Sequence, residues 1–246
     1  MRQIVSSCLI GAVIAACCYA QQVPLLPTSK VGDHVAVFIE PRIDTTQFQP
    51  YLRIIKQQPG SVKAAEAQLA LAMTYYQARA YSGAFSEFRK VVTDYAVGLY
   101  TADAQYYIAQ SHLNLRQYSL TIDEAKKSLN TFPGSKWADA CQYILALSNY
   151  ELGQNQGTIQ EINNMVSRYP SSKYVVDAYT LLGNVFKRQQ KYQEAIEAFR
   201  KITLQSSSIE ERVKTALEIG GVRSLLKDYD GAILEFRKAV DLAQDA

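Results

Sequence analysis

Side chains that commonly carry out nucleophilic, acid–base or metal chemistry are sparse in this chain of 246 residues. Its two histidines, His34 and His112, lie far apart in the sequence, and Cys141 is the only cysteine outside the N-terminal segment. A catalytic thiol needs a histidine partner, and a metal site needs several ligands at characteristic spacings. The sequence contains neither pattern, and it has no glycine-rich loop for binding phosphate. We therefore predict a protein that is not an enzyme and that holds no metal and no cofactor.

The adjacent carboxylates and the lone cysteine suit structural roles. Asp123–Glu124 and Glu210–Glu211 are neighbours in the sequence, and neighbours on a helix point in different directions. Such pairs usually lie on a solvated helix face. Cys141 lies in a helical pattern, where a lone cysteine is most often a small residue of the core.

The composition is that of a globular protein. Hydrophobic residues make up 48% of the chain and charged residues 20%, and a chain of this length can bury a sizeable core. The 26 basic and 23 acidic residues give a net charge of +3. Residues 61–172 hold equal numbers of both signs, so no basic stripe is reserved for a phosphate backbone. We expect no nucleic acid among the partners.

An internal repeat defines the elements that would position any functional side chain. Two independent markers recur in one register, a proline hinge and the start of a helical pattern. Pro59, Pro133 and Pro170 are separated by 74 and then 37 residues. The helical patterns begin 37 residues apart, without a slip, at Tyr81, Tyr118, Asn155, Tyr192 and Tyr229. A period of this size indicates a solenoid of stacked repeats.

Each repeat contains two helical patterns. In the clearest copy, apolar residues recur at spacings of three and four from Tyr179 to Phe186, and the pattern restarts at Tyr192. A serine follows each proline hinge where an N-cap is needed. The predicted N-cap residues are Ser61, Ser135 and Ser172. Small residues at 37-residue spacing predict close crossings between the paired helices. They are Ala72, Ala109, Ala146, Gly183 and Gly220 on the first helices, and Ala84, Thr121, Thr158, Ala195 and Ala232 on the second helices.

These residues resemble the tetratricopeptide repeat (TPR) family, whose pattern spaces large, small and aromatic residues over a helix pair. The best copy supplies Tyr179, Leu182, Gly183, Phe186, Ala195 and Phe199. The second copy departs from the pattern, with His112 at the aromatic position. The resemblance covers roughly residues 45–244. It implies an all-α fold, a right-handed α-solenoid of about five TPR-like helix pairs with a 37-residue period.

The chain is predicted to have three parts. Residues 45–246 form the array, in which an orphan second helix precedes five repeats. Residues 1–20 resemble a secretory signal, since Arg2 is followed by an apolar run from Ile4 to Ala16 that is too short to cross a bilayer. Residues 21–44 form an extended, proline-containing leader or tether. Its segment HVAVFIE is expected either to cover the first helices or to belong to the tether.

The sequence is compatible with two ways of processing the signal. The sequence IAAC at residues 14–17 resembles a lipobox, in which Cys17 would be lipidated and become the first mature residue. The sequence CYA at residues 18–20 resembles an ordinary cleavage site, with cleavage after Ala20. The pattern slightly favours the lipoprotein.

In TPR arrays the concave face is formed chiefly by the first helices, and function is expected there. The family's groove positions fall here on Leu69, Met73, Tyr76, Tyr106, Gln110, Leu113, Tyr143, Leu147, Tyr150, Asn184, Lys187 and Arg188, followed by Leu217 and Ser224 in the last repeat. Tyrosine supplies contact area at low entropy cost. We therefore predict that the groove binds a protein or peptide, with Tyr106 and Tyr143 as anchors on adjacent first helices. The alternative is that some of these tyrosines pack between repeats.

The hinge of proline, serine and aromatic residue followed by Asp-Ala is similar to that of two families of periplasmic proteins. One is the outer-membrane assembly lipoprotein family, and the other contains the Tol-Pal-associated coordinator of division. The similarity implies an exported scaffold in the periplasm, held at the outer membrane as a lipoprotein. Its partners would be a protein or peptide of the cell envelope and, through the lipid anchor, the membrane. The alternative function is a carbohydrate- or peptidoglycan-binding envelope protein that uses the groove tyrosines as stacking platforms.

Overall fold

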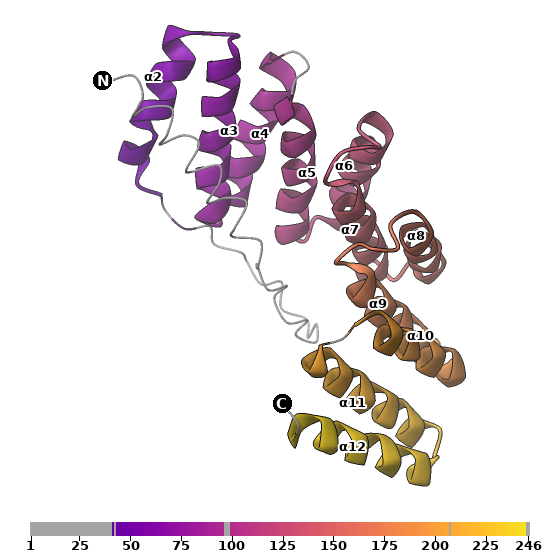
Figure 1. Cartoon of the computed structure of the whole chain (residues 1–246). Coiled ribbons are helices and arrows are strands. Elements are labelled where there is room, and N and C mark those ends of the chain that lie inside the picture. Colours follow the sequence, from indigo (N-terminus) through magenta and orange to yellow (C-terminus); the bar gives the residue numbers. More distant parts are fainter. Residues whose placement is uncertain (1–40, 42, 96–98, 207, 245–246) are drawn as a thin grey trace. The chain divides into compact units, whose positions relative to one another are not determined.

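A computed structural model describes residues 41, 43–95, 99–206 and 208–244. Within these ranges the chain forms eleven α-helices and one short 3-10 helix, and it forms no strand (Figure 1). The first helices of the five repeats are α3 (Val62–Gln77), α5 (Leu99–Asn114), α7 (Ala138–Glu151), α9 (Val175–Arg188) and α11 (Ile209–Leu225). The second helices are α4 (Tyr81–Asp94), α6 (Tyr118–Thr131), α8 (Asn155–Arg168), α10 (Tyr192–Gln205) and α12 (Tyr229–Gln244). The all-α solenoid class is confirmed.

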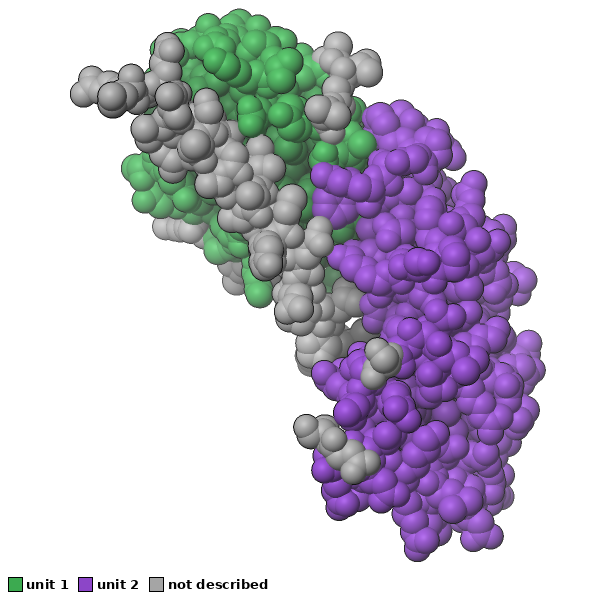
Figure 2. Space-filling view, viewed as in Figure 1, with its two compact units in different colours: residues 1–117 green, residues 118–246 purple. Residues whose placement is uncertain are grey.

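The helices fall into two compact units, residues 1–117 and 118–246 (Figure 2). The first unit contains η1 (Thr45–Phe48), α2 (Gln49–Gln57) and the helices up to α5, and the second contains α6 to α12. In both units each helix packs against the next one along the chain. No helix in the described part of the chain is long and apolar enough to cross a membrane.

The 37-residue period predicts the start of every second helix. The five second helices begin at the five residues named from the sequence. Ahead of them, η1 and α2 occupy the stretch expected to form an orphan second helix, and the Phe48 ring packs 4.7 Å from that of Tyr75 on α3. The predicted signal, the lipidation site Cys17 and nearly all of the leader lie outside the described residues, so they stay predictions.

The predicted close helix crossing is confirmed at the two glycines among the small positions. All ten of the small residues are buried. A Cβ atom added at Gly183 would lie 2.4 Å from Cε1 of Phe199, and one added at Gly220 would lie 2.6 Å from Cε1 of Phe236. Real Cβ contacts are not this short. The aromatic ring of the second helix therefore rests directly on the backbone of the first.

The hinges only partly match the expected caps. Ser61 caps α3, because its hydroxyl oxygen accepts a hydrogen bond from the Ala64 N–H at 3.1 Å. The prediction is wrong for Ser135 and Ser172. Their hydroxyl oxygens accept from the N–H groups of Trp137 and Tyr174, which precede α7 and α9. These serines form the turn before the helix, because two residues, a lysine and an aromatic residue, separate each of them from the first helical residue.

The turn between the two helices of a pair is also periodic. One residue in each turn has a positive φ between 57° and 73°, at Arg79, Arg116, Gly153, Gln190 and Lys227. The next N–H reaches back to a carbonyl of the first helix, as from Ala80 to Tyr75 at 3.0 Å and from Lys191 to Phe186 at 2.9 Å. This is the Schellman ending of a helix, which favours glycine at the left-handed residue. Only Gly153 follows that preference, so the sequence gives little sign of the motif.

Candidate binding surface

The structure divides the twelve predicted groove residues into three groups. Buried are Leu69, Met73, Tyr106, Leu113 and Tyr143. Half-buried are Tyr76, Gln110, Leu147, Tyr150, Asn184 and Lys187, and exposed is Arg188. Tyr106 and Tyr143 therefore pack within the core, which is the alternative that the sequence left open. The binding role of the twelve positions stays a prediction.

An aromatic residue of the next repeat covers Tyr143. The Tyr174 ring stacks on the Tyr143 ring at a centroid distance of 5.2 Å and an interplanar angle of 10°. The resulting burial raises the pKa of the Tyr143 hydroxyl far above its ordinary value. Tyr174 precedes α9, and Tyr100 and Trp137 occur at the same repeat position. This series of aromatic residues was the sequence signal that could have identified Tyr143 as a packing residue.

Core packing also accounts for the predicted groove residues of α3. Leu69 and Met73 belong to a buried cluster that includes Phe88, and Tyr100 packs against this cluster. The Tyr76 ring lies edge-on to Tyr81, Phe88 and Tyr107 at centroid distances of 5.4, 6.4 and 5.2 Å. Its hydroxyl accepts a hydrogen bond from Nδ2 of Asn114 at 3.0 Å. These side chains stabilise the first unit and present little of their surface for binding.

In the second unit, the predicted positions retain polar groups at the surface. The guanidinium of Arg188 on α9 lies 4.4 Å from the centroid of the Tyr150 ring on α7. Arg188 also donates to the Tyr150 carbonyl oxygen at 3.3 Å and to Oδ1 of Asn155. Three contacts, from Tyr150 on α7 and Asn155 at the start of α8, thus hold one exposed cation in a fixed position.

Two neighbours of Arg188 differ in how they are engaged. Lys187 forms an ion pair with Glu218 on α11, with 2.8 Å between Nζ and Oε2. Its charge is therefore already compensated. Asn184 is half-buried, and its amide forms no hydrogen bond among the described residues. An amide has both donors and an acceptor, which suits the main chain of an extended peptide.

We call the second-unit surface the set formed by Leu147 and Tyr150 on α7, Asn184 and Arg188 on α9, and Leu217 on α11. It offers two aliphatic side chains, one fixed cation and one open amide. Leu217 is 49% exposed. This chemistry fits a polypeptide segment that carries an apolar side chain beside a carboxylate.

Sequence reasoning missed a buried polar contact that recurs between paired helices. Nε2 of Gln68 donates to Oε2 of Glu87, and Nε2 of Gln142 donates to Oε2 of Glu161, each at 2.6 Å. The two glutamines and the two glutamates are each separated by two repeat periods. A buried amide bonded to a carboxylate fixes the register of a helix pair at little net cost. The matching 74-residue spacing was visible in the sequence.

The chemically reactive side chains have structural roles. Cys141 is a free, buried cysteine, as predicted, and its S–H donates to the Ser128 hydroxyl oxygen at 3.3 Å. Burial raises the pKa of this thiol to about 11, which opposes formation of a reactive thiolate. His112 packs its ring 4.5 Å from that of Phe85, and its Nδ1 lies 2.7 Å from Oε1 of Gln117. Among the described residues, no group of metal-binding side chains comes together.

Comparisons with known proteins agree with this architecture. The profile of the YfiO family, described as outer membrane lipoprotein, matches residues 61–218, which is more than half of the chain. A comparison with curated protein sequences gave no match.

Solved structures of TPR proteins share the fold. A fragment of MamA from Desulfovibrio magneticus RS-1 aligns with a TM-score of 0.61 and 16% identity, over 74% of this chain and 96% of that one. YrrB, described as a TPR protein with an unusual peptide-binding site, aligns with a TM-score of 0.58 and 16% identity, over 80% and 94%. The apo form of RapI aligns with a TM-score of 0.68 and 14% identity, over 81% of this chain and 59% of that one. At these identities the likeness shows the fold alone.

Proposed function

Because the chain belongs to the YfiO family of outer membrane lipoproteins, we propose that it is an exported, non-catalytic adaptor that binds a protein segment of the cell envelope. The family match is the observation that carries this proposal, and the TPR fold is compatible with it. We place the protein in the periplasm, anchored to the outer membrane through lipidated Cys17, with a role in envelope assembly.

The second-unit surface is the proposed contact for the partner. Arg188 is fixed by Tyr150 and Asn155, so little side-chain entropy would be lost when it pairs with a carboxylate of the ligand. Asn184 would bond the ligand main chain, and Leu147 and Leu217 would contact an apolar side chain. A fixed cation flanked by apolar groups gives both orientation and contact area.

No observation favours the carbohydrate alternative. Sugar recognition by stacking needs open aromatic faces. Tyr106 and Tyr143 are buried, and the face of Tyr150 is covered by the Arg188 guanidinium. The tyrosines that would have stacked on a sugar are thus used in packing.

Crosslinking in intact cells tests the proposed contact. The full chain, carrying the double change Asn184→Ala and Arg188→Ala, should recover much less crosslinked envelope protein than the wild type. Gln193→Ala is the matched control, since this residue is exposed on α10 and lies outside the second-unit surface. Equal recovery by the double variant and the control would contradict the proposed surface.

The anchor is tested separately. Cys17→Ser should release the protein from the membrane fraction or leave its precursor uncleaved. A mature wild-type protein that begins at Gln21 would contradict lipidation and leave the binding proposal standing.

A further inference from the structure

The outer face of α12 carries an apolar stripe at helical spacing. We define the α12 stripe as Tyr229, Ile233, Phe236 and Val240, which lie on one side of the helix at positions i, i+4, i+7 and i+11. Their exposed fractions are 62%, 48%, 38% and 54%. Among the described helices, α12 packs extensively only on α11 (Figure 1).

The same stripe is covered on the inner second helices. Its counterparts on α10 include Ile196 and Phe199, which are almost fully buried where α10 packs on both α9 and α11. On α4 the counterparts are Phe85 and Phe88, which contact His112 and Tyr107 of α5. In the inner repeats this stripe is therefore covered by the preceding and the following helix. On α12 only the preceding helix, α11, packs extensively on it among the described helices.

A second copy of the chain can supply a second covering helix through its own α12. The first helices α3, α7, α9 and α11 are each packed between two helices of their own unit. The α12 stripe is free, and two identical faces related by a two-fold axis form a closed, isologous contact.

We propose that two copies of the chain associate through an antiparallel pair of α12 helices centred on Ile233. Antiparallel alignment about that residue brings Tyr229 of one copy within one residue of the position opposite Phe236 of the other. Ile233 meets its own copy at the axis.

Charge complementarity fixes this alignment. Asp230 and Arg237 lie on one flank of the stripe, seven residues apart, and both are exposed. Neither forms an ion pair within the described part of the chain. In an antiparallel pair centred near Ile233, Arg237 of each copy lies opposite Asp230 of the other. The dimer would thus gain two reciprocal ion pairs.

Sedimentation equilibrium of the full chain, purified as the cell processes it, tests the proposal. The wild type should form a concentration-dependent dimer, and Ile233→Asp should weaken dimerisation by at least about tenfold by placing a carboxylate at the axis. Leu204→Asp is the matched control, because Leu204 is 84% exposed on α10 and should leave the dimer unchanged. Circular dichroism should show the same helical content in all three proteins.

A charge swap distinguishes this specific pairing from nonspecific hydrophobic association. Asp230→Arg and Arg237→Asp should each weaken the dimer, and the double variant should restore it, because the reciprocal pairs are reformed with reversed signs. A wild type that stays monomeric overturns the proposal, as does a dimer that survives Ile233→Asp. Failure of the double variant to recover would overturn the antiparallel alignment on Ile233. None of these outcomes depends on the second-unit surface.

Discussion

The fourth and fifth helix pairs share the same contact between their two helices, but their surroundings differ. In α9–α10 the Phe199 ring rests on Gly183, and in α11–α12 the Phe236 ring rests on Gly220. Phe199 is completely buried, whereas Phe236 is 38% exposed, because a further helix covers α10 and none of the described helices covers α12. The repeat sequence therefore determines the contact within a pair. The energy gained from that contact depends on the neighbouring pair.

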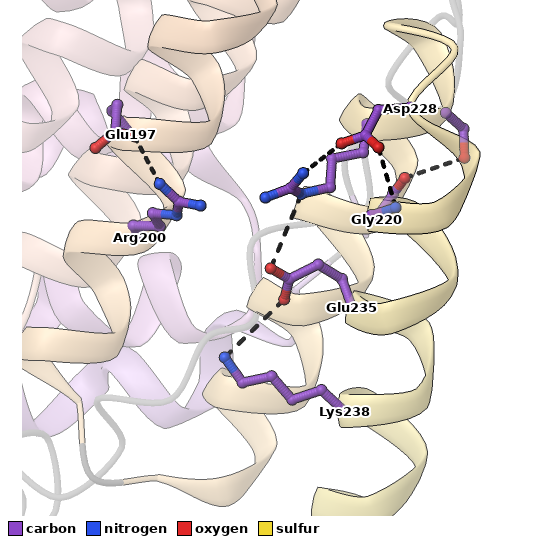
Figure 3. A network of polar contacts seen from close by, with 9 residues as sticks. Glu197, Arg200, Gly220, Asp228, Glu235 and Lys238 are labelled. Carbon is purple, nitrogen blue, oxygen red and sulfur yellow. Dashed lines mark hydrogen bonds and ion pairs between the residues drawn. The ribbon is translucent and has the colours of Figure 1, made fainter.

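The two pairs also differ in the chemistry beside the phenylalanine. Phe186 and Ala198 of the fourth pair are replaced by Arg223 and Glu235 in the fifth. Arg223 pairs with Asp228, and its Nε lies 4.0 Å from Oε1 of Glu235 (Figure 3). The Arg223 Nε and Glu235 Oε2 atoms are buried without hydrogen bonds. Less apolar packing and incomplete polar satisfaction both predict a less stable fifth pair.

Truncation of the two phenylalanines should produce the largest difference. Phe199→Ala should lower the free energy of unfolding by about 3–5 kcal/mol, because it removes a fully buried ring and leaves a cavity. Phe236→Ala should cost clearly less, since part of that ring already contacts water. Chemical denaturation at protein concentrations low enough to keep the chain monomeric measures both. Equal losses would show that coverage by the next helix adds nothing to this contact.

Enlargement of the glycines should have the next largest effect. Gly183→Ala should destabilise the protein by about 1–3 kcal/mol, because the new methyl group would overlap a ring that cannot move. Gly220→Ala should cost less, since the Phe236 ring can shift toward solvent. Gly221→Ala is the control on the same helix: nothing lies within 4 Å of its added Cβ, and alanine favours helix by roughly 0.5–1 kcal/mol. Thermal unfolding of the three variants should thus give two losses of unequal size and one gain.

The start of the second helix provides a third contrast. Asp228 accepts a hydrogen bond from the Gly231 N–H at 3.0 Å ahead of α12, whereas Lys191 at the start of α10 makes no side-chain cap. Lys191→Asp should therefore stabilise the fourth pair by about 1 kcal/mol. Asp228→Asn should lower the melting temperature at neutral pH, because it removes the ion pair with Arg223. An unchanged melting temperature for Lys191→Asp would show that α10 gains nothing from a cap.

The Asp228 contribution should depend on pH. The hydrogen bond from Gly231, and then that from Arg223, lower the pKa of this carboxyl below its ordinary value of 3.8. A carboxyl whose pKa is lower in the folded state stabilises the fold above its unfolded pKa and loses that effect as the pH falls through its folded pKa. The difference in melting temperature between wild type and Asp228→Asn should therefore be present at neutral pH and vanish under strongly acidic conditions. A difference that persists there would mean that the carboxylate charge is not its cause.

The sequence predicts most of the fold because each repeat has to meet the same packing constraints, so the same residue types recur at the same positions. A 37-residue spacing of small residues identifies ten buried positions on the paired helices, and the same spacing locates the start of each second helix. The Schellman turns were harder to foresee. Arg79, Gln190 and Lys227 adopt positive φ although their side chains disfavour it, so the fold imposes this conformation on the local sequence.

The candidate site was predicted less well, and the reason is physical. Groove positions were assigned by counting along one helix, but exposure depends on what the next repeat places against them. Tyr143 occupies a groove position in its own repeat and is buried by Tyr174 of the next. Arg188 occupies such a position where nothing covers it, and it remains exposed. A single-repeat pattern cannot distinguish these two cases.

The smallest expected effect concerns the left-handed residues, and here the two pairs should behave alike. Gln190 and Lys227 hold φ values of 59° and 62° at equivalent turns. Replacing either with glycine removes a local strain of about 1–2 kcal/mol and adds entropy to the unfolded chain, so each variant should gain only about 0.5 kcal/mol. Gly153→Ala at the same position of the third pair should lose a similar amount. Because backbone strain is local, coverage by a neighbouring helix should not change it, unlike the effect of truncating Phe199 or Phe236. If denaturation shows that Gln190→Gly stabilises the protein and Lys227→Gly does not, the turns are not equivalent, and the difference between the pairs extends to their backbones.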